Sequence, residues 1–278
     1  MKTPQTARTG VYKEIASVSN PIIKDLRGLS MRKNRQATNR FMTEGLKLVA
    51  AGCEAGWTLS IFLFGEKAAS NQLVMELAAL SKSRGGMVLK VSEPVLQKLS
   101  RRDNAQTVIG IFEQALTPAT AIQAKAHSLW VALDGVKDPG NLGTIVRTAD
   151  AAGATGIILI GETTDPFALE AVRATMGSIF SLPLVRFSRT EFAEFAKTWS
   201  GLIVGTHLSA NTDYRAPDYR QPAILLMGNE QSGLDDDAVA LCTDLVRIPQ
   251  RGRADSLNLA IATGIMLFEM QRDDLILE

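Results

Sequence analysis

The chain has 278 residues, of which 46% are hydrophobic and 21% charged, and its 30 basic and 29 acidic residues leave a net charge of +1. This is the composition of a globular protein, and no apolar run approaches the roughly 18 to 20 residues that a membrane-spanning helix needs. The polar N-terminus lacks the apolar core of a secretory signal, and Cys53 and Cys242 lie far apart without metal-ligand spacing, so we expect a cytoplasmic protein with free thiols, no membrane partner and no metal.

Charge is distributed unevenly along the chain. Residues 1–116 hold 17 lysines and arginines against 9 acidic residues, a balance of +8, whereas the remainder holds 13 against 20, a balance of −7. The cations are densest in one stretch, where six of them meet only Asp25: Lys24, Arg27, Arg32, Lys33, Arg35 and Arg40. Such clusters bind nucleic-acid phosphates with little sequence selectivity, although a solvated helix face has the same pattern. Because acidic residues do not balance this half, we expect the six side chains to bind RNA.

The basic half predicts a small α/β domain. Helix-like stretches cover 20–31, 46–52, 69–84 and 94–99, and strand-like apolar runs cover 59–64, 87–91 and 108–112. Residues 117–127 follow as a small, polar segment that contains Pro118, and they predict a linker. We therefore expect two domains, residues 1–116 and 128–278, on either side of that linker.

The second domain opens with an apolar run, 129–133, that predicts a buried strand. Asp138-Pro139-Gly140-Asn141 then turns the chain, and Asn141 is a good N-cap for a helix running to Ala152. This helix is apolar or small nearly throughout, yet it carries Arg147. A long cation in such a helix is either paired, here with Asp150 at i,i+3, or used in function.

Two later blocks have the same order of strand, polar loop and helix start. The apolar run 224–227 precedes an amide-rich loop with one carboxylate, Gly228-Asn229-Glu230-Gln231-Ser232-Gly233. The run 245–249 leads through Arg251-Gly252-Arg253-Ala254-Asp255 into Ser256-Leu257-Asn258 and a last helix. Ligands of open α/β sheets bind at the carboxyl ends of the strands, so three such loops would form a single site.

Together the three blocks resemble the signature motifs of the SpoU (TrmH) family of SPOUT methyltransferases, in order and at ordinary spacing, between Ser128 and Glu269. The resemblance implies a SPOUT α/β fold with a deep trefoil knot, formed as the chain from Leu225 to the last helix threads a preceding loop. It also implies methyl transfer from S-adenosylmethionine to a ribose 2′-hydroxyl of RNA. The first domain resembles the small α/β substrate-binding domain, similar to a ribosomal protein, that precedes many SpoU enzymes; its matching motifs are Ser19-Asn20-Pro21, Glu44-Gly45 and Asn104-Ala105-Gln106.

The resemblance also assigns the site residues. It places the donor against the backbone edges and shape of five residues: Thr206, Met227, Gly228, Ile248 and Leu257. It nominates five residues for catalysis: Arg147, Asn141, Glu230, Ser256 and Asn258. A guanidinium has a pKa above about 12 and rarely gives up its proton, so we expect Arg147 to bind the target phosphate and stabilise the developing alkoxide rather than act as a base.

The remaining polar residues have supporting roles in this interpretation. Glu230 and Asn141 are expected to orient Arg147 and its loop. Asn258 either fixes the ribose or the first loop, or simply caps the last helix beside Ser256. Arg251 and Arg253 flank the pocket and suggest contacts to the RNA backbone, although Arg253 also has Asp255 as an available ion-pair partner.

The last helix is apolar nearly all round. One stripe holds Leu257, Ala260, Ile261, Gly264, Ile265 and Phe268, and the opposite side holds Leu259, Ala262, Met266 and Met270. A helix of this kind is buried on both sides. One side is expected to pack on its own sheet and the other on a second subunit, as family members are typically homodimers; a larger core within one chain is the alternative.

The sequence thus predicts a two-domain cytoplasmic RNA ribose 2′-O-methyltransferase that uses S-adenosylmethionine, forms a homodimer and acts on structured RNA, in the first place ribosomal RNA. Three alternatives remain open at this point. The substrate is tRNA, the protein is a catalytically silent RNA-binding or ribosome-assembly factor on the same fold, or it methylates a base as another SPOUT branch does.

Overall fold

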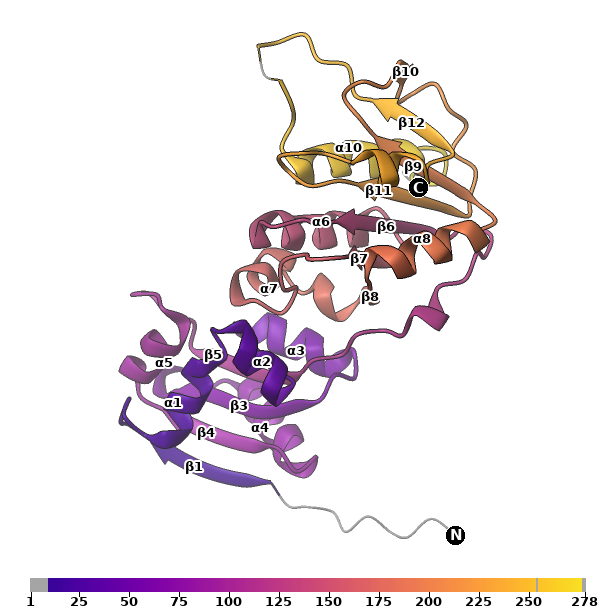
Figure 1. Cartoon of the computed structure of the whole chain (residues 1–278). Helices are drawn as coiled ribbons and strands as arrows, with labels where there is room; N and C mark the ends of the chain where they lie inside the picture. Colours follow the sequence, from indigo (N-terminus) through magenta and orange to yellow (C-terminus); the bar gives the residue numbers. More distant parts are fainter. Residues whose placement is uncertain (1–9, 254, 277–278) are drawn as a thin grey trace, which may run out of the picture. The chain divides into compact units, whose positions relative to one another are not determined.

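Two β-sheets organise the chain in the computed structural model, which describes residues 10–253 and 255–276 (Figure 1). Each sheet lies in its own compact unit. Unit 1 comprises Met1–Gln114 together with the short segment Phe167–Arg173, and unit 2 comprises Ala115–Pro166 and Ala174–Glu278.

Unit 1 is built on a mixed five-stranded sheet in the described part of the chain. Its strand order is β1 (Val11–Ile15), β4 (Met87–Val91), β3 (Leu59–Gly65), β5 (Val108–Glu113) and β2 (Arg40–Glu44). The first three strands are parallel, and β5 runs antiparallel to both of its neighbours. The accompanying helices are α1 (Pro21–Gly28), α2 (Arg32–Thr38), α3 (Leu46–Glu54), α4 (Gln72–Ser83) and α5 (Glu93–Ser100).

The basic stretch forms two helices rather than the single helix predicted over 20–31. Asn20 caps α1, since its side chain accepts a hydrogen bond from the Ile22 N–H at 2.9 Å, and Pro21 suits the first helical position. The helix ends at Gly28, and α2 begins at Arg32. Ile23 and Leu26 anchor α1 in the core of unit 1, which leaves the cations of this helix facing outward.

Unit 2 is built on an all-parallel sheet with seven strands among the described residues. The order is β10 (Thr212–Asp213), β12 (Asp244–Arg247), β9 (Leu202–Thr206), β11 (Ala223–Met227), β6 (Leu129–Asp134), β7 (Gly156–Ile160) and β8 (Leu184–Phe187). The helices are α6 (Pro139–Ala151), α8 (Arg189–Thr198), α9 (Asp236–Val239) and α10 (Leu259–Met270), while α7 (Leu169–Thr175) falls mainly within the segment that belongs to unit 1. The central strands β6 and β11 are buried throughout, which explains their unbroken apolar runs.

Helices cover both faces of this sheet. Phe192 of α8 packs with Trp130 and Ile224 on one face, and on the other α10 lies beside α6 and against β11 (Figure 1). Residues 117–127, predicted as a linker, belong to unit 2: Ile122 is buried there, and the Thr117 N–H donates to the Leu184 carbonyl at 2.8 Å. In the described residues we find no helix with the length and apolar character to cross a membrane.

Candidate functional site

Polar loops follow three strands of the unit 2 sheet at the same edge. They span residues 135–138 after β6, 228–235 after β11, and 248–253 with 255–258 after β12. β6 and β11 are neighbours, and β12 is separated from β11 only by β9. Because every strand is parallel, the carboxyl ends meet at one edge, as the sequence predicted.

Hydrogen bonds connect side chains of the second and third loops to Asn141, in the first turn of α6 directly after the first loop. The Glu230 carboxylate accepts from the Asn141 amide at 3.3 Å, and the Asn141 oxygen accepts from the Asn258 amide at 2.9 Å. Glu230 also accepts the backbone N–H groups of Lys137 at 3.2 Å and Asp138 at 3.1 Å. Three of the five nominated catalytic residues are therefore in direct contact.

The environment of Glu230 keeps it ionised. Burial is the largest influence and works to raise the pKa of this carboxyl. The backbone N–H groups of Glu230 itself, Asp138 and Lys137, with the amide of Asn141, act together in the opposite direction and hold the pKa below its ordinary value. A carboxylate in this state accepts hydrogen bonds near neutral pH and is poorly suited to accept a proton.

Asn141 is free for this network because it does not cap α6. The helix begins at Pro139, and Asp138 is its N-cap, with a carboxylate oxygen that accepts from the Asn141 N–H at 2.6 Å. The predicted cap at Asn141 was therefore wrong. Proline is favoured at the first helical position and aspartate immediately before it, so Asp138-Pro139 is the stronger start signal.

Asn258 fulfils two of the roles considered for it. Its side-chain oxygen caps α10, accepting from the N–H groups of Ala260 at 2.9 Å and Ile261 at 3.2 Å. Its amide nitrogen holds Asn141 and hence the first loop. The last helix and the first loop are thus fixed to each other through one side chain.

A cavity of about 490 Å³ lies against these loops. All five residues expected to contact the donor line it: Thr206, Met227, Gly228, Ile248 and Leu257. Glu230 and Ser256 line it too, which brings the hydrogen-bond chain to its wall. A volume of this size is typical of cofactor pockets.

Gly228 is required by the shape of its loop. A Cβ at this position would lie 2.1 Å from the carbonyl carbon of Gly233, because the loop closes on itself there. Asn229 and Gly233 exchange two backbone hydrogen bonds, of 3.1 and 2.9 Å. The glycine therefore serves the tight turn, and through that turn it leaves bare backbone on the cavity wall.

Arg147 lies outside this cavity. It is exposed on α6, and within residues 10–253 and 255–276 it makes no hydrogen bond or ion pair, so the proposed pair with Asp150 does not form. Arg251 and Arg253 are exposed on the segment between β12 and α10, and no ion pair joins Arg253 to Asp255 among the described residues.

The basic residues of unit 1 do not all reach solvent. Lys24, Arg27, Arg32 and Lys33 are exposed. Arg40 is paired with Asp25 at 2.9 Å. Arg35 corrects the sequence interpretation: it is only 4% exposed, and its guanidinium donates to the Leu29 carbonyl at 2.8 Å, so it braces the turn between α1 and α2 instead of meeting RNA.

Several residues of interest were missed in the sequence. Arg101 and Arg102 are exposed after α5. The Arg101 guanidinium donates to the Ser30 hydroxyl at 2.6 Å, which places it beside the turn between α1 and α2. His207 lines the cavity, with its Nδ1 2.7 Å from the Ser209 hydroxyl. Isolated residues of this kind carry no motif, and only their strand-end or helix-end positions mark them.

The cysteines are free and unreactive in character. Burial raises the pKa of both thiols, that of Cys242 to about 11. Among the described residues no group of histidine, cysteine and acidic side chains is arranged to hold a metal ion.

Comparison with known proteins gives two family matches. Residues 128–268 match the model described as the SpoU rRNA Methylase family, and residues 20–110 match the MRM3-like substrate binding domain. The crystal structure of an AdoMet-bound rRNA methyltransferase from Sinorhizobium meliloti is similar, with a TM-score of 0.90 and 51% identity over 95% of this chain and 99% of that one.

Two sequence relatives extend over nearly the whole chain. The 23S rRNA (uridine(2479)-2′-O)-methyltransferase of Streptomyces viridochromogenes is 31% identical over 88% of this chain and 86% of its own length. The 23S rRNA (guanosine(2553)-2′-O)-methyltransferase RlmP of Bacillus subtilis is 30% identical over 93% of this chain and 99% of its own.

Proposed function

Because this chain belongs to the SpoU rRNA methylase family, we propose that it transfers a methyl group from S-adenosylmethionine to a ribose 2′-hydroxyl of ribosomal RNA. The observation that carries the proposal is the hydrogen-bond chain Glu230–Asn141–Asn258, which ends at the wall of a cofactor-sized cavity. The relatives named above support ribosomal RNA as the substrate, since their names specify 2′-O-methylation of 23S rRNA.

The cavity residues fit S-adenosylmethionine. Apolar side chains of Met227, Ile248 and Leu257 offer a surface for an adenine ring, and the tight turn at Gly228 exposes backbone that an added Cβ would cover. When bound, the sulfonium supplies an already activated methyl group, so the protein has to align the reactants and exclude water.

The polar residues would then position the RNA rather than perform acid–base chemistry. Glu230 is held as an acceptor by two backbone N–H groups of the first loop, so it fixes the loop and the start of α6. Arg147 stabilises negative charge on the target phosphate and the ribose oxygen as the hydroxyl gives its proton to the phosphate or to water. Ser256 confines the ribose at the cavity wall, while Asn258 holds Asn141 in place.

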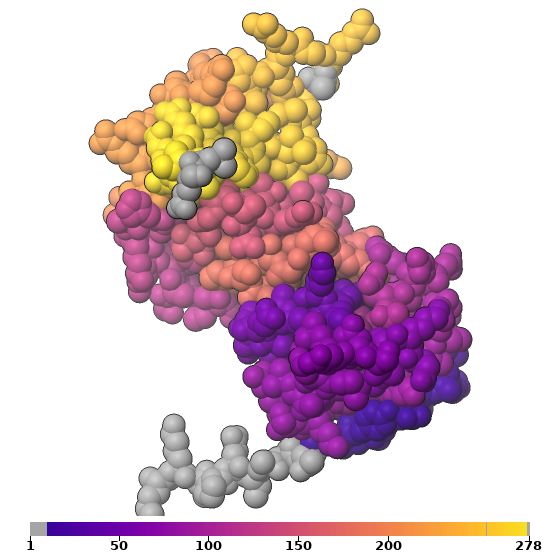
Figure 2. All heavy atoms as spheres, turned by 180° about the vertical axis from the view of Figure 1, so that it is seen from behind, coloured from indigo at the N-terminus to yellow at the C-terminus, as the bar shows by residue number. Residues whose placement is uncertain are grey.

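A homodimer explains the position of Arg147. Ile261 and Phe268 of α10 are 55% and 50% exposed and, with half-buried Ile265, form an apolar stripe at helical spacing. The yellow atoms at the end of the chain reach the surface of unit 2 in Figure 2. The helix α6, which carries Arg147, packs beside α10. We infer that two copies pair through this stripe and that Arg147 of each copy serves the cavity of the other.

The proposal also includes RNA binding by unit 1, a trefoil knot in unit 2 and a cytoplasmic location. The exposed cations of unit 1 favour RNA binding by that unit, with methyl transfer in unit 2. The trefoil knot stays a prediction; it is supported by the order β12–β9–β11, in which the chain must cross β9 between β11 and β12. A ribosomal substrate and two unpaired thiols favour the cytoplasm.

The direct test uses methyl-labelled S-adenosylmethionine with ribosomal RNA, with tRNA as a separate substrate. After nuclease digestion to nucleosides, the proposal requires label in a 2′-O-methylated nucleoside from ribosomal RNA. Label in tRNA would correct the substrate, and label in a nucleobase would correct the reaction. Failure to label any RNA, despite donor binding, would identify a silent RNA-binding factor.

A further inference from the structure

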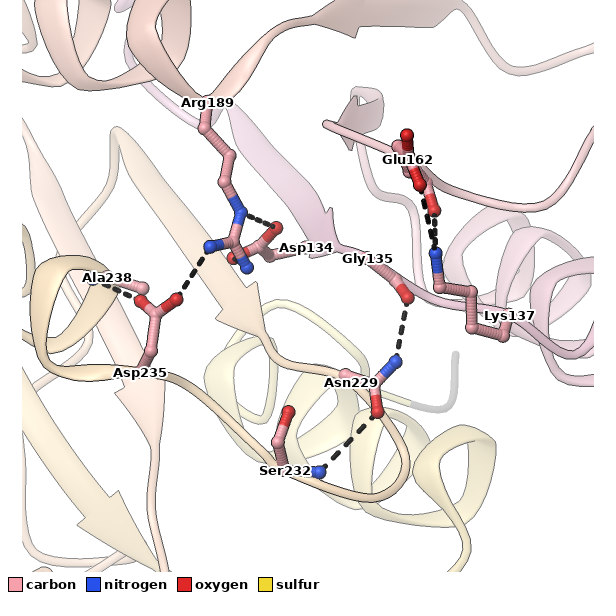
Figure 3. Close-up of polar contacts among 9 residues, drawn as sticks. All are labelled: Asp134, Gly135, Lys137, Glu162, Arg189, Asn229, Ser232, Asp235 and Ala238. Atoms are coloured by element: carbon pink, nitrogen blue, oxygen red, sulfur yellow. Dashed lines mark hydrogen bonds and ion pairs between the residues drawn. The ribbon is translucent and has the colours of Figure 1, made fainter.

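Arg189, the first residue of α8, bridges two carboxylates, one immediately before the first site loop and one at the end of the second (Figure 3). Its Nε donates to Asp134 at 3.1 Å and its Nη2 lies 2.9 Å from the second oxygen of the same carboxylate. Its Nη1 donates to Asp235 at 2.6 Å. Arg189 does not line the 490 Å³ cavity, so any effect on that cavity passes through other residues.

The two carboxylates mark the ends of the loops. Asp134 is the last residue of β6, immediately before the first loop, and its side chain is only 7% exposed. Asp235 is the last residue of the second loop and caps α9, where it accepts from the Ala238 N–H at 3.0 Å. The guanidinium therefore ties the start of the first loop to the end of the second.

The same two loops are also joined on the side of the site. The Asn229 amide donates to the Gly135 carbonyl at 2.8 Å, as Figure 3 shows, and Glu230 accepts the two backbone N–H groups of the first loop. Residues 228–233 line the donor cavity. The position of this wall relative to the first loop thus depends on contacts at both ends, of which the Arg189 bridge is the one outside the cavity.

Side chains around this bridge are not packed tightly enough to hold the loops in place if the bridge is lost. Asp134, Arg189 and Asp235 border a second cavity of about 390 Å³, whose other walls include Phe192 and Leu226. Side chains do not fill this space, so loss of the guanidinium leaves room for the loops to shift. Burial raises the pKa of Asp134, and the neighbouring Arg189 opposes part of that rise.

Helix stability does not explain an arginine at this position. A cation in the first turn of a helix is disfavoured by the helix dipole. The start of α8 is already secured by the capping box of Ser188 and Glu191. The bridge to the two loops is the interaction that accounts for the residue.

We propose that Arg189 is a positioning residue that sets the affinity for S-adenosylmethionine by fixing the spacing of the loops after β6 and β11. This inference rests on the proposed function, because the second loop matters only if the cavity it lines holds the donor. Lysine at this position would keep one positive charge beside Asp134, but as a compact point charge it cannot bridge both carboxylates as a planar guanidinium does.

The test measures donor binding by calorimetry and thermal unfolding for the full chain and four variants. Arg189→Lys should unfold near the wild-type temperature yet bind S-adenosylmethionine about tenfold more weakly, a loss of the order expected for one charge-assisted hydrogen bond. Arg189→Gln should unfold at a lower temperature than the wild type and should also bind S-adenosylmethionine more weakly. Asp235→Asn should keep the α9 cap and weaken donor binding. Arg220→Gln removes an exposed pair with Asp218 elsewhere in unit 2 and should change neither.

The outcomes separate this inference from the proposed function. Wild-type donor affinity in both Arg189→Lys and Asp235→Asn would overturn the positioning role and leave the proposed function standing. A lowered unfolding temperature with unchanged affinity in Arg189→Gln would overturn it as well, because the bridge would then serve only stability. If the wild-type protein binds no S-adenosylmethionine, the proposed function is wrong, and this inference is wrong as well because it depends on that function.

Discussion

The Asn258 amide nitrogen donates to the Asn141 side-chain oxygen across 2.9 Å, and this contact determines which way the Asn141 amide is turned. Asn141 can donate to Glu230 only while its oxygen faces Asn258. A flipped Asn141 amide would lose both bonds, and Asn258 is itself oriented because its oxygen caps α10. Along this hydrogen-bond network, Asn258 therefore fixes the orientation of Asn141, and Asn141 in turn donates to Glu230.

Replacement of Asn258 should separate its two roles. Asn258→Asp keeps a side-chain oxygen for the α10 cap but places a carboxylate against the Asn141 oxygen, so we expect near-normal stability and at least about tenfold slower methyl transfer. Asn258→Ala removes the cap as well and should also cost about 1 kcal/mol of stability. Chemical denaturation and single-turnover methylation assays measure the two effects. Equal turnover by wild type and Asn258→Asp would show that the contact to Asn141 does not contribute to methyl transfer.

Glu230 should contribute to stability in a defined pH range. Its pKa is lowered in the folded protein from an ordinary value of 4.5, so its stabilising contribution is present above that pH and is lost as the pH falls through the lowered value. Glu230→Gln removes this titration and turns an amide NH₂ towards a backbone N–H. We expect the stability difference between wild type and variant to shrink on acidification below about pH 4.5. A difference that grows in acid would contradict the assigned direction.

Within unit 1, Arg173 neutralises a buried carboxylate. Its guanidinium makes contacts of 2.7 to 2.9 Å with Glu44, whose side chain is 2% exposed, and also donates to the Ser100 carbonyl at 2.7 Å. Arg173→Met would leave that charge buried and unpaired, so we expect a loss of about 3–5 kcal/mol in urea unfolding. The matched variant Arg173→Met/Glu44→Gln should recover much of it. No recovery would mean that packing around Arg173, and not the ion pair, carries the stability.

The apolar stripe on α10 should determine the oligomeric state. Phe268→Glu places a charge in the proposed interface, so we expect monomers in analytical ultracentrifugation at concentrations where the wild type is dimeric. Met75→Glu is the control, because Met75 of α4 is equally exposed, at 51%, but lies in unit 1. Dimers of Phe268→Glu that are as stable as those of the wild type would place the interface elsewhere.

The site loops could be predicted because each depends on local sequence. A buried parallel strand demands a continuous apolar run, and a polar loop must follow where the strand ends, so the runs at β6 and β11 located both loops. That the loops meet follows from the parallel sheet alone. The contacts of Glu230 with backbone N–H groups, by contrast, depend on loop geometry that no spacing in the sequence encodes.

Other features depend on partners distant in the chain and were missed for that reason. The strand β1 is largely exposed and exists only through its pairing with β4, and β2 is held by β5. Arg35 carries the same charge as its exposed neighbours, and only the turn between α1 and α2 draws it inside. Arg189 belongs to no motif, and its role emerges only when Asp134 and Asp235 are brought together.

In the proposed dimer one active site combines the cavity of one copy with Arg147 of another, and a heterodimer of two inactive variants tests this most directly. Arg147→Ala keeps an intact cavity, whereas Ile248→Trp fills the cavity and keeps Arg147. Co-expression with two different affinity tags isolates dimers that contain one copy of each. Such heterodimers hold one complete site, so we predict ribose methylation at roughly half the wild-type rate while each homodimer is inactive. A heterodimer as inactive as both homodimers would contradict the shared site.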